Sequence, residues 1–180
     1  MSGNAAQYFV TRHGAGAAQN KPAFIDAVSG ASITYGDLDA QSDKMAGLLA
    51  AHGLRREDRA AMLVLDEIEY PVMFWGALKA GVIAIPLNTL LAAPVYKTIL
   101  EDCGARALFI SAALLPVVEP ILAEIESIEK IFVLGDAPEG MLDFRAELAA
   151  AAAAPTEEQS GWAAWVAKAQ NFYFFDLFEG

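Results

Sequence analysis

The chain has 180 residues, which is enough to bury the core of one domain. Its formal net charge of −11 at pH 7 argues against nucleic acid and anionic membrane surfaces as partners. The single cysteine, Cys103, excludes a framework of disulfides and is compatible with a location in the cytoplasm. We expect Cys103 to be a small buried side chain rather than a catalytic thiol.

The beginning of the chain predicts a short helix followed by a β-hairpin. No basic region followed by an apolar region stands at the N-terminus, so we expect no signal peptide. Residues 4–18 predict a short helix whose second half frays at its glycines. Residues 23–26 and 31–34 flank the turn-forming pair Ser29-Gly30, which is typical of a small hairpin.

A long helix is predicted to follow Thr34. The hydroxyl of Thr34 and the carboxylate of Asp37 have the spacing of a helix-capping pair. Apolar residues then recur on one helical face as far as His52, and Gly53 suits the left-handed residue that ends a helix. We interpret His52 as a residue of the last turn, favoured there by the helix dipole, rather than as a catalytic base.

Residues 59–65 form an apolar run typical of a parallel strand that is covered on both faces. The carboxylates of Asp66, Glu67 and Glu69 come directly after it. They have two interpretations. We favour the first, in which they are N-cap and first-turn charges of the next helix. In the second they belong to a site at the carboxyl end of the strand.

Residues 70–91 predict an apolar helix, a break, a buried strand and an exit loop. The helix is apolar on nearly all sides and is therefore expected to be buried. Gly81 separates it from a β-branched strand that ends at Pro86. Residues 70–87 carry only one charge, Lys79, and are just long enough to cross a membrane. We favour the buried helix and strand because Lys79 and Gly81 interrupt the stretch.

The next segment repeats the order of helix and strand. Pro94 suits the first turn of a helix, and Gly104 suits its end. Residues 107–110 are apolar and predict a short strand. Ser111 is expected to cap the helix that follows, because a hydroxyl there can accept a hydrogen bond from a free backbone N–H.

The last predicted elements are two helices with a strand between them. Residues 114–128 have helical spacing, although two prolines perturb the first half. Residues 130–134 predict a strand, and residues 142–154 predict a helix that ends in an alanine tract. The chain would then consist of an α/β domain over residues 1–154 and an aromatic-rich tail over residues 155–180.

Strands and helices that alternate through short connections predict an α/β fold. We expect a doubly wound, mostly parallel sheet with flanking helices, because parallel neighbours need crossover connections. The sequence also predicts which residues fill the core of this domain. They are Leu48, Leu63, Leu65, Phe74, Leu78, Ile83, Ile85, Ile99, Leu108, Ile110, Ile121, Phe132 and Leu134.

Several segments in this order resemble the start of an adenylate-forming acyl-CoA synthetase. They are ITYGDLD (33–39), LVLDEIEYPVMFWGALKAGVIAIPLN (63–88), ILEDCGARALFIS (99–111) and KIFVLGD (130–136). NAAQYF near the N-terminus, PLNTLL (86–91) and GMLDF (140–144) are most similar to the benzoate-CoA ligase group. The resemblance covers residues 4–150 and implies the first subdomain of the family's N-terminal domain.

The resemblance implies a two-step reaction. The full-length family joins a carboxylic acid to ATP with Mg²⁺, giving an acyl-adenylate and pyrophosphate, and then passes the acyl group to coenzyme A. In the family, a glycine-rich phosphate loop would follow soon after residue 160, and no such loop is present in this sequence. We therefore expect no catalytic, cofactor-binding or metal-binding residue here, no cofactor for this chain, and no activity of the chain alone. Pro86, Asn88 and Thr89 are expected to line one wall of the substrate cleft.

The tail departs from the family pattern and is rich in aromatic side chains. These are Trp162, Trp165, Phe172, Tyr173, Phe174, Phe175 and Phe178. The tail either folds back over the sheet, or binds a partner, or is a non-native end produced by truncation or a frameshift. The expected partner is accordingly the remainder of the ligase, or a second copy of the chain that associates through the tail.

Two further hypotheses compete with the ligase. The first is a stand-alone, non-catalytic interaction domain that self-associates through its aromatic tail. The second is a different small α/β enzyme with a site near Asp66 and Glu67, at the ends of the strands. The two histidines, His13 and His52, are too far apart in the sequence and too poorly accompanied to indicate a metal site.

Overall fold

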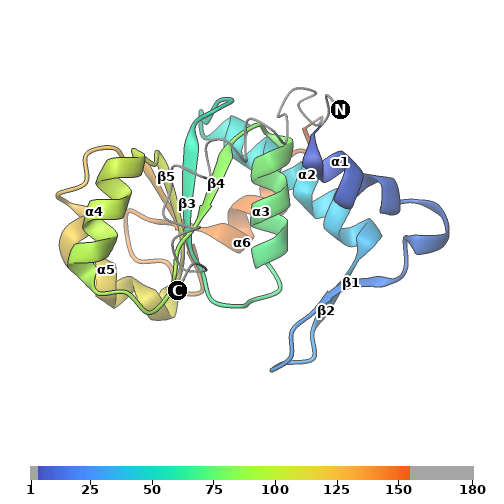
Figure 1. Cartoon of the computed structure of the whole chain (residues 1–180), viewed down its shortest axis with the longest axis horizontal. Helices are drawn as coiled ribbons and strands as arrows, with labels where there is room; N and C mark the ends of the chain where they lie inside the picture. The colour runs from blue at the N-terminus through green and yellow to red at the C-terminus, as the bar shows by residue number, and fades with distance from the viewer. Residues whose placement is uncertain (1–3, 155–180) are drawn as a thin grey trace, which may run out of the picture.

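A parallel sheet of five strands forms the centre of the molecule in a computed structural model that describes residues 4–154 (Figure 1). The strands are β3 (Arg59–Leu63), β4 (Ile83–Pro86), β5 (Ala107–Ser111), β6 (Lys130–Leu134) and β7 (Leu142–Asp143). Their order across the sheet is β4-β3-β5-β6-β7, and all neighbours are parallel. The predicted doubly wound α/β fold is thus confirmed.

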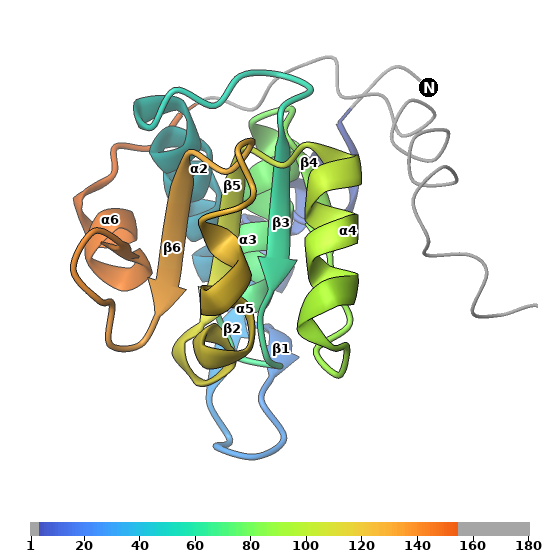
Figure 2. The ribbon, with the colours of Figure 1, turned by 90° about the vertical axis from the view of Figure 1, so that its left-hand side faces the viewer.

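Helices cover both faces of the sheet (Figures 1 and 2). One face carries α2 (Tyr35–Ala51), α3 (Tyr70–Lys79) and α6 (Phe144–Ala150), and α1 (Ala5–Phe9) packs outside α3. The other face carries α4 (Ala93–Cys103) and α5 (Leu115–Leu122). A hairpin of β1 (Pro22–Ile25) and β2 (Ser32–Thr34) projects beyond the sheet.

The central strands are buried because each faces helices on both sides. All five residues of β5 are buried, and their side chains alternate between the two cores. On the side of α6, Phe109 stacks on Phe132 with ring centroids 4.7 Å apart, and Phe144 meets Phe109 edge-on. This aromatic cluster joins β5, β6 and α6.

The expected hairpin and the ends of the long helix are confirmed. Thr34 is the N-cap of α2, and its hydroxyl accepts a hydrogen bond from the backbone N–H of Asp37 at 3.1 Å. His52 is the C-cap of α2, and Gly53 follows in the left-handed region at φ +79°. Gly104 ends α4 in the same way, with φ +57°.

Three predicted helices are shorter than expected. Within residues 4–18 only α1 is an α-helix, because the backbone continues as two short 3₁₀ turns around Gly14 and Gly16. Within residues 114–128, α5 ends at Leu122, two residues after Pro120, the second proline of that helix. The prediction that residues 142–154 form one helix is also wrong, because α6 covers only Phe144–Ala150.

The sequence missed β7, and the reason lies in Asp143. Its carboxylate accepts a hydrogen bond from the N–H of Ala146 at 3.0 Å, so Asp143 is an N-cap with an extended backbone. The extended pair Leu142–Asp143 is then free to align beside β6. At its other end α6 stops at Ala150, and the extended chain beyond it runs along α2, where the N–H of Ala154 bonds to the carbonyl of Asp43.

Most of the predicted core is buried. Leu48, Leu63, Leu78, Ile85, Leu108, Ile110, Phe132 and Leu134 are buried, while Phe74, Ile83, Ile99 and Ile121 are partly buried. The prediction is wrong for Leu65, which is 39% exposed. Strand β3 ends at Leu63, so Leu65 lies in the loop that leaves the sheet.

A buried ion cluster, which the sequence did not predict, joins α3 to α2. The side chain of Lys79 has no exposed surface, and its Nζ lies 2.6 Å from Asp39 Oδ1 and 2.7 Å from Asp43 Oδ1. The ammonium also donates to the carbonyl of Asp39, and the hydroxyl of Thr11 donates to the Asp39 carboxylate. All three N–H groups of Lys79 are thereby satisfied.

Close packing of α2 and α3 depends on Gly76. A Cβ atom at this position would lie 2.3 Å from the Cβ of Met45, so only glycine allows the two helices to approach this closely. No helix within residues 4–154 has the length and apolarity that crossing a membrane requires. The aromatic residues of the predicted tail, and hence the expected domain boundary after residue 154, lie outside the described residues.

Candidate functional site

The carboxyl ends of the parallel strands meet at the edge of the sheet nearest the hairpin (Figure 2). The chain leaves β3 toward β4 on one side, and after β4 and α4 it returns to β5 on the other side. The gap between the ends of β3 and β5 is therefore the topological switch point, where doubly wound proteins generally bind ligands. The loop that follows β3 carries Asp66, Glu67 and Glu69 to this place.

Ser111, the last residue of β5, holds the loop after β3 in position. Its side chain is buried, and its Oγ accepts a hydrogen bond from the N–H of Leu65 at 3.0 Å. The same hydroxyl donates to Glu67 Oε1 at 2.7 Å. The prediction that Ser111 caps the following helix is wrong, because its side chain makes no capping bond there. It instead ties two neighbouring strand ends together.

Arg145 of α6 extends this contact to a third element. Its Nε lies 2.6 Å from Glu69 Oε1, and its Nη2 lies 3.3 Å from Glu67 Oε2. The hydrogen bond that Arg145 donates to Glu69 is the main reason that the pKa of Arg145 is raised. Of the two interpretations of these acids, the first correctly places Glu69 at the N-cap position of α3, although its side chain makes no capping bond there.

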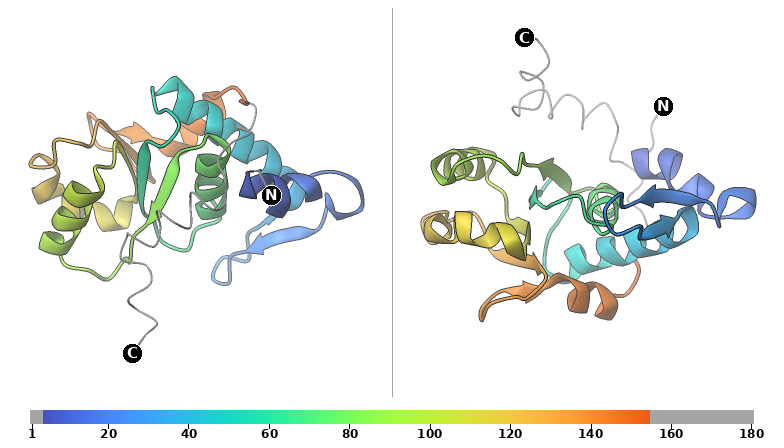
Figure 3. Two further views of the ribbon diagram at one scale, coloured as in Figure 1. Left: turned by 45° about the horizontal axis from the view of Figure 1, so that its top comes forward. Right: turned by 90° about the horizontal axis from the view of Figure 1, so that it is seen from below.

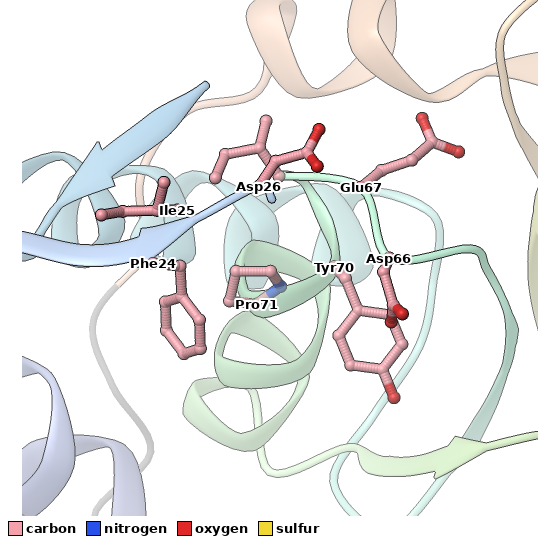
Figure 4. Close-up of a pocket in the computed structure, with 8 residues that line it drawn as sticks. Phe24, Ile25, Asp26, Asp66, Glu67, Tyr70 and Pro71 are labelled. Atoms are coloured by element: carbon pink, nitrogen blue, oxygen red, sulfur yellow. The ribbon is translucent and has the colours of Figure 1, made fainter. Parts of the chain in front are cut away.

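A shallow hollow of about 220 Å³ lies between the hairpin and the start of α3 (Figure 4). It is lined by Phe24, Ile25, Asp26, Asp66, Glu67, Ile68, Tyr70 and Pro71. The rings of Phe24 and Tyr70 lie on opposite sides of Pro71, and Asp66 lies beside Tyr70. The structure thus brings Asp66 and Glu67 to one site, next to two aromatic rings.

The three carboxylates of the hollow differ in their surroundings. Asp26 accepts hydrogen bonds from the Ser29 hydroxyl and the Val28 N–H, which lower its pKa. Glu67 is held by Ser111 and Arg145, as described above. Asp66 is exposed and makes no hydrogen bond to any residue between 4 and 154. Only Asp66 is therefore free to meet a ligand.

Tyr70 adds a phenol to the polar groups of the hollow. Burial raises the pKa of its phenol, and the negative charge of Asp66 raises the pKa further. The phenol therefore stays protonated at neutral pH and can donate a hydrogen bond. Asp66 and Tyr70 with the neighbouring rings suit binding of a polar group with an apolar body. Within the described part of the chain, this hollow contains no nucleophile next to a base.

The predicted cleft wall follows β4 on the same edge of the sheet. Asn88 Oδ1 accepts a hydrogen bond from the N–H of Leu90 at 2.8 Å, and Tyr96 donates its hydroxyl to the carbonyl of Asn88 at 2.7 Å. These bonds fix the loop, and they leave Pro86 and Thr89 partly exposed. The loop lies outside the hollow, and its role as a cleft wall stays a prediction.

The other candidate side chains have structural partners. His52 Nε2 lies 2.8 Å from Glu147 Oε2 of α6, which fits a residue at a helix end. Cys103 is buried as expected, and burial raises the pKa of its thiol. Among residues 4–154, no group of three or more His, Cys, Asp or Glu side chains is arranged to hold a metal ion.

Comparisons with a family model and with individual known proteins point to the same family. Residues 11–167 match the AMP-binding enzyme family. The chain is 37% identical over 158 residues to a 4-hydroxybenzoate–CoA/benzoate–CoA ligase of Rhodopseudomonas palustris, covering 88% of this chain and 28% of that ligase. It is 35% identical over 140 residues to a benzoate–CoA ligase of Thauera aromatica, covering 77% of this chain and 26% of that ligase.

Solved structures agree with the sequence comparison. The crystal structure of a benzoate CoA ligase from Burkholderia xenovorans superposes with a TM-score of 0.72 and 33% identity, covering 87% of this chain and 30% of that one. The chain spans about a quarter of the length of the curated relatives that it matches. The fold and the site described above therefore correspond to one part of a longer architecture.

Proposed function

Because the chain belongs to the family of AMP-binding enzymes, we propose that it forms the N-terminal part of an ATP-dependent ligase for an aromatic or other carboxylic acid. In this reaction the carboxylate attacks the α-phosphorus of ATP and releases pyrophosphate. The thiol of coenzyme A then attacks the acyl carbon of the adenylate, and AMP leaves. The relatives' names, two of which include benzoate and coenzyme A, support this substrate class.

The described residues contribute a scaffold rather than the reacting groups. They do not fit ATP or Mg²⁺, because residues 4–154 have no metal-binding cluster and the printed sequence has no glycine-rich phosphate loop. We therefore assign no step of the reaction to a side chain of this chain. The 180-residue chain alone is expected to form no acyl-adenylate, and its single cysteine supports a location in the cytoplasm.

We further propose that the loop after β4 forms one wall of the acid-binding cleft, with Pro86, Asn88 and Thr89 as its lining. Two observations support this. The loop lies at the carboxyl ends of parallel strands, the edge at which this class of fold binds ligands. Its backbone is also fixed by Asn88 and Tyr96, and a fixed loop can present Thr89 to a substrate without a large ordering cost.

A domain exchange tests the proposal. Residues 4–154 would replace the matching segment of the Burkholderia benzoate CoA ligase, and release of pyrophosphate would be measured with benzoate, ATP and Mg²⁺. We expect turnover by the chimera and none by the 180-residue chain. A folded chimera that is inactive with every carboxylic acid offered, or an active isolated chain, would overturn the proposal.

The same chimera tests the cleft wall. We expect Thr89→Trp to raise KM for benzoate, because a large ring at this position would enter the cleft. Val117→Trp is the matched control, since Val117 is 40% exposed on α5, on the opposite helical layer from α3. If KM is unchanged by Thr89→Trp, the loop is no wall of the cleft.

A further inference from the structure

The hollow beside the start of α3 belongs to the side of the molecule that carries the hairpin. Figure 3 shows β1 and β2 projecting from the layer of α1, α2 and α3, on the side opposite α4 and α5. The hollow lies between this hairpin and α3, and its volume of about 220 Å³ is smaller than the ~300 Å³ at which sites for drug-sized ligands begin. It therefore has room for a small ligand.

The lining of the hollow carries an excess of negative charge. Asp26, Asp66 and Glu67 line it. Glu67 is paired with Arg145, but the same guanidinium also pairs with Glu69, so one positive charge meets two carboxylates. Asp66 is exposed and has no hydrogen-bond or ion-pair partner within the described part of the chain. The hollow therefore attracts a cation and repels an anion.

Aromatic rings lie next to this charge. The rings of Phe24 and Tyr70 lie on opposite sides of Pro71, and Asp66 lies beside Tyr70 (Figure 4). Phe24 is 44% exposed, so a ligand can reach its ring. Burial is the first cause of the raised pKa of Tyr70, and the charge of Asp66, which reaches the phenol, is the second. Aromatic rings attract cations through their negative faces, so the rings and the carboxylate favour the same kind of ligand.

The loop that carries Asp66 is fixed before a ligand arrives. The hydroxyl of Ser111 bonds to both neighbours of Asp66 in the sequence. It accepts a hydrogen bond from the N–H of Leu65 at 3.0 Å and donates one to Glu67 at 2.7 Å. A ligand that pairs with Asp66 therefore has little backbone to order, which lowers the cost of binding.

We propose that the hollow binds a small organic cation that carries an aromatic ring, of the arylalkylammonium class. The ammonium pairs with the carboxylate of Asp66, and the ring packs over Pro71 between Phe24 and Tyr70. The inference does not rest on the proposed ligase function, because no step of that reaction is assigned to these residues. The ligand also has the opposite charge to a carboxylic acid, and its site is separate from the loop after β4.

A titration of the ¹⁵N-labelled 180-residue chain with 2-phenylethylammonium tests the proposal, at pH 7 and constant ionic strength. We expect the amide signals of Asp66, Glu67 and Tyr70 to shift, and those of α4 and α5 to stay unchanged. For a ligand of this size we expect a dissociation constant on the order of 1–10 mM.

Two further compounds separate the contributions of charge and ring. 2-Phenylethanol has the ring without the charge, and benzoate has a ring with the opposite charge. Both should shift the same amide signals much less than 2-phenylethylammonium does at equal concentration. If the cation leaves these signals unshifted, or if either control compound shifts them as strongly, the proposal is overturned.

Variants of the lining test which side chains bind the cation. Asp66→Asn should weaken binding by about fivefold, the upper end for an exposed ion pair. Phe24→Leu removes a ring but keeps an apolar side chain, and should weaken binding by about two- to fivefold. Asp102→Asn is the matched control, because Asp102 is exposed on α4, and it should leave the affinity unchanged. An affinity that is the same in Asp66→Asn and Asp102→Asn would contradict the proposed site, and the amide spectrum of each variant verifies its fold.

Discussion

Ser42 and Ser111 are both buried, but only Ser111 has hydrogen-bond partners. The hydroxyl of Ser111 connects the N–H of Leu65 to the carboxylate of Glu67. The hydroxyl of Ser42, on the side of α2 that faces α3, makes no hydrogen bond within the described residues. A buried hydroxyl therefore stabilises the fold at Ser111, where it is hydrogen-bonded, and slightly lowers the free energy of unfolding at Ser42, where it is not.

Alanine at the two serines should have opposite effects on the free energy of unfolding. Ser111→Ala leaves the N–H of Leu65 without its partner and removes one of the two partners of Glu67, which keeps Arg145, and we expect a loss of about 1–3 kcal/mol. Ser42→Ala removes an unsatisfied buried group, and we expect no change or a gain of up to about 1 kcal/mol. Urea unfolding followed by circular dichroism measures both. Equal losses for the two variants would contradict the assignment.

Tyr70 and Asp66 are coupled by charge at the edge of the sheet. Because the pKa of Tyr70 is raised in the folded chain, the phenol binds its proton more tightly there than in the unfolded chain. The resulting stability is fully present below the unfolded pKa of about 10 and is lost as the pH rises through the folded pKa. Stability should therefore fall at alkaline pH.

Asp66→Asn should lower the pKa of Tyr70 but leave it above its ordinary value. The charge of Asp66 is the smaller of the two causes, and burial remains in the variant. Ultraviolet titration of tyrosinate, with Tyr70→Phe subtracted, measures the change. Asp136→Asn, in the loop after β6, is the control and should leave the titration of Tyr70 unchanged. An unaltered titration in Asp66→Asn would exclude the coupling.

At the scale of elements, helix ends and hairpins were more predictable than contacts between elements. The ends of α2 are predictable from sequence because they depend on local properties. The Thr34 hydroxyl can cap the first turn, and Gly53 can adopt the left-handed conformation after the last one. Arg145 and Glu69 are 76 positions apart, and nothing in their local sequence indicates that they meet. For the same reason the sequence predicts a helix at Leu142–Asp143, where the structure has the two-residue strand β7.

Lys79 is the clearest element-scale contact, because it binds α3 to α2. We expect Lys79→Met to lower the free energy of unfolding by up to about 3 kcal/mol, since it leaves two partly exposed carboxylates beside each other without their cation. Lys97→Met is the matched control, because Lys97 forms its ion pairs on the exposed side of α4 and should change stability little. Urea unfolding of both variants measures the difference, and similar losses would contradict this role.

At the scale of the whole molecule, the order of elements predicted the fold class and several matching segments predicted the family. The hydrophobic period indicates helices and strands, and short connections between them imply a parallel sheet. The candidate site was predicted only in part. Asp66 and Glu67 were placed at a strand end by sequence, but Phe24 and Tyr70 meet there only because the hairpin folds against the start of α3.

The two outer strands of the sheet have a consequence for the behaviour of the chain in concentrated solution. An open sheet with long flat edges recruits strands from other molecules and forms aggregates. Here one edge strand, β4, is four residues long and ends in Pro86. Proline has no backbone N–H that could bond to a strand of another molecule. The other edge strand, β7, has only two residues. Both edges of the sheet are thus poor templates for pairing with a strand of another molecule.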